Sequence, residues 1–162
     1  MDVKIEQKVA VLIDGNNIEK SVHKIFDDKS KMINYDELIP RILQGRSLGI
    51  LTYYREGDNI SDKLGKRLHN KFFGIVKPCY KQVDIQLTID AVQMADKVDT
   101  VIICSGDSDY IALVNYLKSR GLRVETASVE HSTAKALTDI ADWHHTIDEK
   151  DCYDYKSIPK SK

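Results

Sequence analysis

Two stretches decide the fold of this chain, Val9-Ala10-Val11-Leu12-Ile13-Asp14-Gly15-Asn16-Asn17 and Thr100-Val101-Ile102-Ile103-Cys104-Ser105-Gly106-Asp107-Ser108-Asp109. Each is a short apolar run that gives way abruptly to carboxylates and small polar residues. Such a run predicts a parallel strand that is buried on both faces. In an open α/β sheet, the carboxyl ends of these strands deliver side chains into one crevice. We therefore expect the carboxylates of the two stretches to lie close together.

The rest of the chain alternates strand-like and helix-like segments. Strands are predicted over residues 8–13, 47–54, 75–80, 100–104, 122–127 and 143–147, and helices over about 17–26, 35–43, 61–73, 83–98, 107–120 and 132–140. Pro40 predicts a short or kinked second helix. Ile85, Ile89 and Val92 form an apolar stripe on the fourth. This alternation predicts a three-layer α/β domain, with a mainly parallel sheet of about five strands and helices on both faces.

Size and composition indicate one folded domain. The length of 162 residues suits a single core, and the 42% apolar content is ordinary for a globular protein. We expect the domain to cover residues 1–149 and residues 150–162 to form a poorly ordered tail. No segment approaches the ~18 apolar residues that a membrane span requires, so no membrane association is expected.

Charge and cysteine content limit the partners and the compartment. The formal net charge is -1, from 24 basic and 25 acidic residues, so a polyanion would need a local basic surface or a bound metal. Cys79, Cys104 and Cys152 are far apart and form no C-x-x-C pair. A disulfide framework is therefore not expected, and a reducing, cytoplasmic environment fits best. The five histidines have no metal-binding spacing and are interpreted as isolated surface residues.

The acids at the strand ends carry the chemical hypothesis. Asp14 follows five apolar residues, and Asp107 and Asp109 follow the second buried run. Each could simply cap the next helix, but one cap suffices after a strand. Converging acids repel one another unless a cation lies among them, and Mg²⁺ takes oxygen ligands of this kind and commonly meets substrate phosphates. The sequence therefore predicts a metal-assisted site for phosphate chemistry.

Other polar residues are candidates for supporting roles. Asp84 opens a predicted helix, where the helix dipole alone favours an acid. Asp90 follows six residues later, about 600° of rotation, so it faces elsewhere and is expected to brace the structure or to meet a neighbouring helix end. Asp142 is equally well interpreted as a supporting acid or a surface acid. Three small side chains could hydrogen-bond a phosphate or orient a carboxylate: Asn16, Asn17 and Ser105.

Basic residues gather in one predicted helix and its flanks. A solvated helix face explains them, and so does a rim that tracks phosphates beside the acidic site. Three tyrosines lie nearby in the sequence: Tyr53, Tyr54 and Tyr80. They are interpreted either as core residues or as platforms on which unpaired bases stack. On the second interpretation, the RNA-binding residues are Arg55, Lys63, Lys66, Arg67 and Lys81.

Taken together, these residues resemble the NYN domain family, PIN-like ribonucleases that include the LabA-like proteins. The resemblance rests on residues 11–17, 81–91 and 105–110 in this order, with a closing acid and aromatic at 141–143. It implies a PIN-like (Rossmann-like) fold with an Mg²⁺ or Mn²⁺ site that hydrolyses RNA phosphodiester bonds. Carried over by position, Asp14, Asp84, Asp107 and Asp109 would form that site, with Asn17 in support. Asp90 falls on a family-like position, and Tyr110 stands where Phe is more usual.

Three functions are open at this point. The first is a metal-dependent endoribonuclease acting on single-stranded or structured RNA, with a homodimer as the expected assembly. The second is a regulatory module that keeps the acidic pocket and binds RNA or protein without catalysis. The third is a phosphatase of the haloacid dehalogenase type. That class needs a second aspartate two residues after the first, where this chain has Asn16.

Overall fold

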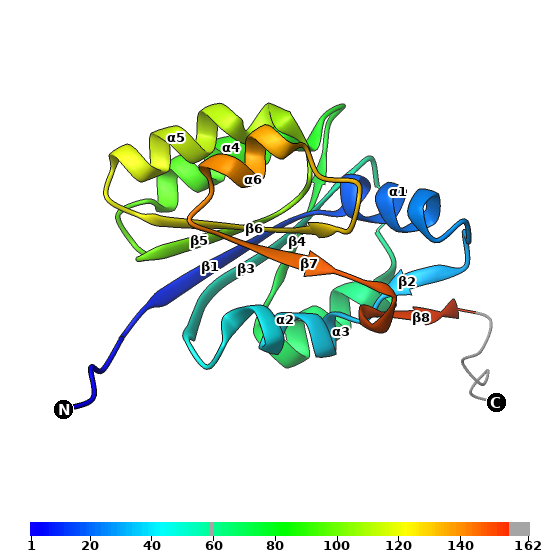
Figure 1. Ribbon diagram of the computed structural model, residues 1–162. Coiled ribbons are helices and arrows are strands. Elements are labelled where there is room, and N and C mark those ends of the chain that lie inside the picture. Colours follow the sequence, from blue (N-terminus) through cyan, green and yellow to red (C-terminus); the bar gives the residue numbers. More distant parts are fainter. Residues whose placement is uncertain (59, 156–162) are drawn as a thin grey trace.

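The protein folds into strands and helices that alternate along the chain (Figure 1). The structure is a computed structural model, and it describes residues 1–58 and 60–155. The first half contains β1 (Lys8–Asp14), α1 (Gly15–Ile25), β2 (Lys31–Ile33), α2 (Tyr35–Leu43), β3 (Ser47–Glu56), α3 (Asp62–Phe72) and β4 (Ile75–Cys79). The second half contains α4 (Val83–Met94), β5 (Thr100–Cys104), η1 (Ser108–Tyr110), α5 (Ile111–Ser119), β6 (Arg123–Val129), α6 (Lys135–Ile140), β7 (Trp143–Ile147), η2 (Glu149–Asp151) and β8 (Cys152–Asp154).

The main sheet confirms the predicted architecture, with six strands in the order β4-β3-β1-β5-β6-β7. Every neighbouring pair in it is parallel. The chain first builds outward from β1 to β3 and β4, then returns and builds outward through β5, β6 and β7. The strand order therefore reverses between β1 and β5, and crevices for ligands open at the carboxyl ends of strands at such a reversal. The carboxyl ends of β1 at Asp14 and of β5 at Cys104 lie there.

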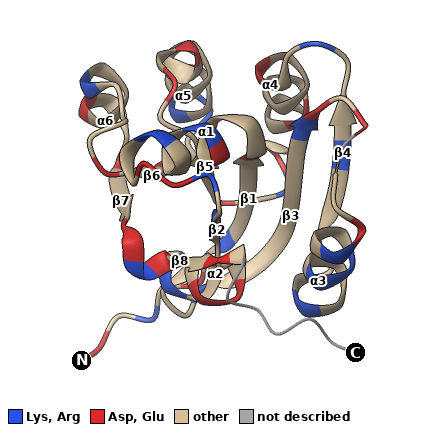
Figure 2. Cartoon of the chain, turned by 90° about the vertical axis from the view of Figure 1, so that its right-hand side faces the viewer, with Lys and Arg blue, Asp and Glu red and all other residues tan. Residues whose placement is uncertain are grey.

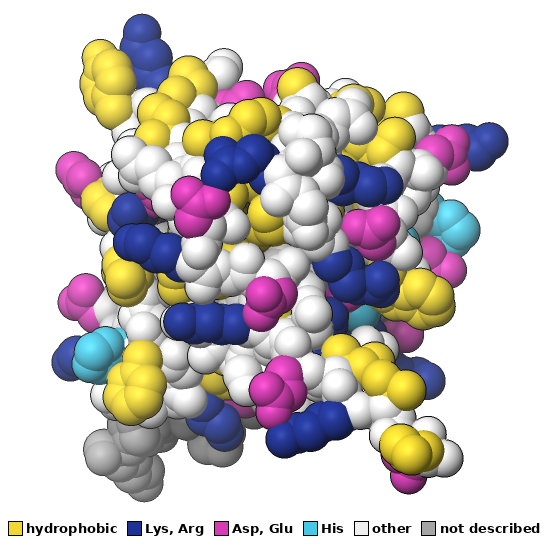
Figure 3. Space-filling view, turned by 90° about the vertical axis from the view of Figure 1, so that its left-hand side faces the viewer, with side chains coloured by type: hydrophobic (Ala, Val, Ile, Leu, Met, Phe, Trp, Pro, Cys, Tyr) yellow, Lys and Arg dark blue, Asp and Glu magenta, His cyan; other side chains and the backbone are white. Residues whose placement is uncertain are grey.

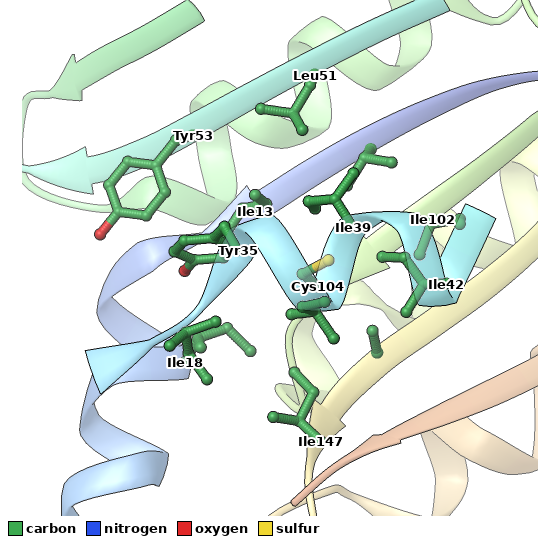
Figure 4. Packing of buried hydrophobic residues seen from close by; sticks show 14 of the residues in the cluster. Ile13, Ile18, Tyr35, Ile39, Ile42, Leu51, Tyr53, Ile102, Cys104 and Ile147 are labelled. Atoms are coloured by element: carbon green, nitrogen blue, oxygen red, sulfur yellow. The ribbon is translucent and has the colours of Figure 1, made fainter. Parts of the chain in front are cut away.

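Two apolar clusters lie on the two faces of the sheet, and alternate residues of each central strand belong to one or the other. Val11 and Ile13 of β1 pack with α1, α2 and α3, together with Ile102 of β5 (Figure 4). Leu12 of β1 and Ile103 of β5 pack with α4, α5 and α6. The near-continuous apolar runs are explained by this burial on both faces.

The apolar stripe expected on α4 faces solvent, and this correction matters for the site. Ile85 is 61% exposed and Ile89 47% exposed, whereas Leu87 and Ala91 are fully buried. The helix carries apolar residues on several sides, so periodicity alone cannot select the buried one. Asp90 lies on the buried side because its carboxylate is satisfied there by three hydrogen bonds.

The chain after residue 149 also departs from the expectation of a poorly ordered tail. Residues 149–151 form η2, and β8 pairs with β2 as a small antiparallel sheet. Neither strand was predicted, because each has only three residues and its partner lies more than a hundred residues away. The rest of the tail, residues 156–162, lies outside the described residues.

A buried ionic cluster ties β6 to β7 and to the end of α2. Glu125 is 1% exposed and accepts hydrogen bonds from Arg46 at 2.6 and 2.8 Å, and from Arg123 at 2.7 Å. His145 lies with its Nε2 2.7 Å from the same carboxylate, so the expectation that it is a surface residue is wrong. The three cysteines are free, as expected. Within the described part of the chain, no helix is long and apolar enough to cross a membrane.

Candidate active site

Asp14 lies at the last position of β1 and points toward the face covered by α4 and α5. It is 5% exposed. One carboxylate oxygen accepts the backbone N–H of Asn17 at 3.1 Å, so Asp14 does cap α1. The other oxygen accepts the hydroxyl of Tyr110 at 2.9 Å. A carboxylate has about four lone-pair positions, so these two bonds leave further positions for a ligand.

The loop after β5 brings the second group of acids to the same edge. Asp107 caps η1, where its Oδ1 accepts the backbone N–H of Asp109 at 2.9 Å. Ser105 is fully buried, and its hydroxyl accepts the backbone N–H of Asp107 at 3.2 Å. The two acids therefore have different roles in the loop. Asp107 is half-buried, and both its backbone N–H and its carboxylate are hydrogen-bonded, whereas Asp109 is exposed.

Asn16 and Asn17 fasten the start of α1 to its neighbours. The side-chain oxygen of Asn17 accepts the backbone N–H of Gly106 at 3.0 Å, which joins the β1 end to the β5 end. That of Asn16 accepts the backbone N–H of Glu56 at 2.7 Å, which joins α1 to the end of β3. Both residues thus position the strand ends rather than pointing freely at a ligand.

Gly15 is required by the close approach of β3. A Cβ atom at this position would lie 2.5 Å from the Tyr53 ring and 2.7 Å from the backbone oxygen of Tyr54. Both distances are shorter than real side chains adopt, so any larger residue would push α1 away from β3. The tight strand-to-helix turn, and with it the placement of Asp14, depends on this glycine.

These acids line one groove together with Asp84 from the start of α4. The groove has a volume of about 1070 Å³. In Figure 2, α1, whose first residues line the groove, lies between the α4–α6 layer above and the α2–α3 layer below. All four acids predicted from the sequence are among its lining residues: Asp14, Asp84, Asp107 and Asp109. Asn16, Asn17 and Arg55 line it as well.

The electrostatics of Asp14 show the cost of bringing these acids together. Burial raises the pKa of Asp14 above its ordinary value, and the charges of Asp107 and Asp84 raise it further. The Asn17 N–H and the Tyr110 hydroxyl oppose this effect. Burial, and then the charge of Asp14, keep the pKa of Tyr110 well above its ordinary value, so its hydroxyl remains a donor. A cation at this point would relieve the repulsion.

The donor set suits a hard divalent cation that keeps part of its water shell. Within residues 1–58 and 60–155, no three acidic, histidine or cysteine side chains lie close enough to ligate one ion. Mg²⁺ is commonly held by only one or two carboxylates, with water and substrate phosphate completing its shell. Asp14 and Asp107 fit this description, since each keeps unused oxygen lone pairs at the groove.

Two of the predicted supporting acids lie away from the groove lining. Asp90 accepts hydrogen bonds from Tyr54 at 2.7 Å and Lys77 at 2.8 Å, so it braces β3 and β4 against α4 as expected. Asp142 precedes β7 and lies at the amino ends of the strands, where it accepts the backbone N–H of Val124 at 2.8 Å. That opposite end carries interspersed basic and acidic side chains (Figure 3).

The predicted RNA-binding residues are divided between two places. Arg55 lines the groove but is ion-paired with Glu19 of α1. Lys81 is exposed next to the groove residue Gln82 and lies 5.6 Å from the Tyr80 ring. The other three are exposed on α3, outside the groove lining: Lys63, Lys66 and Arg67.

Sequence reasoning missed the groove residues of α1. Glu19, Lys20, His23 and Lys24 line the groove beyond the acids. Their helical spacing from Asn16 was a usable signal, because a helix that begins at a site carries one of its faces along it. The predicted helix at 61–73 has the same spacing and more basic residues.

Comparison with known proteins agrees with this geometry. A model of the NYN domain family matches residues 8–149. The chain belongs to the NYN domain family. NYN domains are PIN-like nucleases, and the PIN-like fold predicted from the sequence is confirmed.

This NYN domain is similar to one curated protein and to one solved structure. The uncharacterized protein MJ0482 of Methanocaldococcus jannaschii is 29% identical over 161 residues, which cover 98% of this chain. The match covers 63% of that relative, so this NYN domain spans less than two thirds of its length. VPA0982, a protein of unknown function from Vibrio parahaemolyticus, has a crystal structure that matches with a TM-score of 0.78 at 24% identity, covering 94% of this chain and 100% of that one. This second likeness concerns the fold.

Proposed function

We propose that this NYN domain is a metal-dependent endoribonuclease that hydrolyses RNA phosphodiester bonds. The observation that carries the proposal is the convergence of Asp14, Asp84, Asp107 and Asp109 on one groove at the point where the strand order reverses. Acids brought together at a cost to Asp14 are typical of a functional site, because burial and like charges rarely coincide without a ligand.

Asp14 and Asp107 would hold Mg²⁺ or Mn²⁺, with Asp84 and Asp109 completing the shell through water. The bound ion would polarise the phosphoryl oxygens and lower the pKa of a water that attacks in line. The chain's own contribution is to fix the geometry. Tyr110 and the Asn17 N–H hold the Asp14 carboxylate, and the Asn17 side chain fixes the β5 loop beside it.

A second candidate is a regulatory module that binds RNA or protein without cutting. It would use the same groove and the same converging acids for binding alone. The phosphatase alternative has no such support, because the Asn16 side chain already bonds the Glu56 N–H. The homodimer, the cytoplasmic location and the LabA-like assignment stay predictions.

Cleavage of a labelled RNA panel separates the two candidates. Single-stranded and hairpin RNAs are incubated with Mg²⁺, Mn²⁺ or EDTA, and the Asp107→Asn protein serves as the matched variant. The nuclease predicts cutting with metal, no cutting in EDTA, and loss of cutting in the folded variant. Binding without cutting under every condition would support the regulatory module instead.

A further inference from the structure

The groove does not end at the acidic site but continues along α1. Beyond the acids its lining passes Lys20, His23 and Lys24 and reaches the turn at residues 27–29. A helix rises about 1.5 Å per residue, so the 11 residues of α1 give this extension a length of roughly 16 Å. The site is therefore one end of a longer channel.

A second hollow of about 640 Å³ continues from that turn. It shares Asp27, Asp28 and Lys29 with the first and adds Ser30, Met32 and Tyr155. Pairing of β2 with β8 holds this end together, and the backbone N–H of Tyr155 donates to the backbone carbonyl oxygen of Ser30 at 2.9 Å. The two hollows together lead from the acids at the β1 end to an exposed aromatic ring.

We propose that single-stranded RNA lies in this continuous groove, from the acidic site along α1 to Tyr155, and that α3 does not carry it. The inference rests on the proposed function for the identity of the polymer. It assigns the strand to a helix that the charge pattern of the sequence did not single out.

The groove extension carries side chains of both signs: Lys20, Lys24 and Lys29 line it, and so do Glu19, Asp27 and Asp28. Lys20, Lys24 and Lys29 are exposed, and among the described residues none has an acidic partner within 4.0 Å. Arg55, in contrast, is engaged by Glu19. Three cations at successive points of a groove can each meet a phosphate of a strand that leaves the acids.

The far end of the groove suits an unpaired base. Tyr155 is 61% exposed, and Met32 lies in the same hollow. Every base has a flat face that can stack on an aromatic ring, and only an unpaired base is free to do so. At about 3.4 Å per stacked nucleotide, the roughly 16 Å of groove along α1 holds about five nucleotides on one side of the cut.

Salt-dependent binding of a fluorescent single-stranded RNA tests the path. Affinity is measured by anisotropy in Ca²⁺ and in EDTA for the protein, for Lys20→Ala/Lys24→Ala/Lys29→Ala, and for the matched control Lys63→Ala/Lys66→Ala/Arg67→Ala. Each phosphate contact on a single strand contributes about 0.7 to the slope of log affinity against log salt. We expect the α1 variant to lose about 2 from this slope, and the α3 control to keep the slope of the unaltered protein.

Tyr155→Ala adds a readout that net charge does not affect. It should weaken single-strand binding about tenfold, the magnitude of one lost base–aromatic stack, and leave duplex binding unchanged.

Equal slopes in both triple variants, or a loss confined to the α3 control, would overturn the proposed path. If the α1 variant loses binding but the protein never cuts, the path stands and the nuclease proposal fails. If the protein cuts and the α1 variant binds RNA normally, the nuclease proposal stands and the path along α1 fails. If the protein binds no RNA, the nuclease proposal and the path both fail.

Discussion

Replacing Gly15 by alanine tests how tightly the fold controls the site. The new Cβ would lie 2.5 Å from the Tyr53 ring, about 0.9 Å inside the 3.4 Å at which ordinary contact begins. Tyr53 cannot easily turn away, because it is 4% exposed and packs edge-on against Tyr35 with ring centroids 6.0 Å apart. The start of α1 must therefore move by most of this distance. Overpacking of this kind costs about 1–3 kcal/mol.

The same shift should damage the site more than the fold. Asp14 directly precedes Gly15 and Asn17 follows two residues after it, and a misplacement of about 1 Å costs roughly 100-fold in rate. Urea denaturation measures the free energy of unfolding, and Mn²⁺ titration and RNA cleavage measure the site. Gly65→Ala is the matched control: the nearest atoms to its Cβ are Val76 methyls at 3.7 and 3.8 Å, so it should stabilise α3 by about 0.5–1 kcal/mol and leave cleavage unchanged. A Gly15→Ala protein with unaltered stability, Mn²⁺ affinity and cleavage would refute the reasoning.

Three further changes test the electrostatics and the positioning bonds. Asp14→Asn should raise the metal-free melting temperature at neutral pH: burial raises the folded pKa above its ordinary 3.8, so ionisation destabilises the fold as pH rises through that window, and the gain should vanish below it. Glu125→Gln should cost roughly 3–5 kcal/mol in urea denaturation, because it leaves the largely buried Arg46 guanidinium, 12% exposed, without its counter-charge. Burial alone would raise the pKa of Glu125, but the bonds from Arg46, His145 and Arg123 hold it well below its ordinary 4.5, so this contribution is present above that value and is lost as pH falls below it. Asn17→Ala should cost about 1 kcal/mol or more by removing the acceptor of the Gly106 N–H, and should lower cleavage further than this loss of stability explains.

The sequence predicts those features that depend on local pattern. Residues 9–13 and 101–104 are apolar at every position because both faces of the central strands are buried, so the positions and ends of these strands can be read directly. Parallel strands then bring these ends to one edge, which places the acids together. Pro78 is accommodated because β4 is an edge strand of the sheet.

Features that depend on distant partners could not be predicted in this way. The buried side of α4 packs Leu87 and Ala91 into the core, and Asp90 is accommodated there by distant partners, of which Tyr54 comes from β3 and Lys77 from β4. His145 is buried because Glu125, twenty residues earlier, accepts from it. The pairing of β8 with β2 likewise joins opposite ends of the chain. Nothing in the local spacing distinguishes these residues from surface ones.

The central claim is that the converging aspartates hold a metal ion that cuts RNA, and one cleavage experiment tests it most directly. A labelled single-stranded RNA is incubated with the protein and with Asp107→Asn, each in Mn²⁺ and in EDTA, after equal folding of both proteins has been checked by thermal melting. The account predicts cutting by the unaltered protein in Mn²⁺ alone. Cutting that persists in EDTA or in the Asp107→Asn protein, or no cutting by a folded protein that binds Mn²⁺, would contradict it.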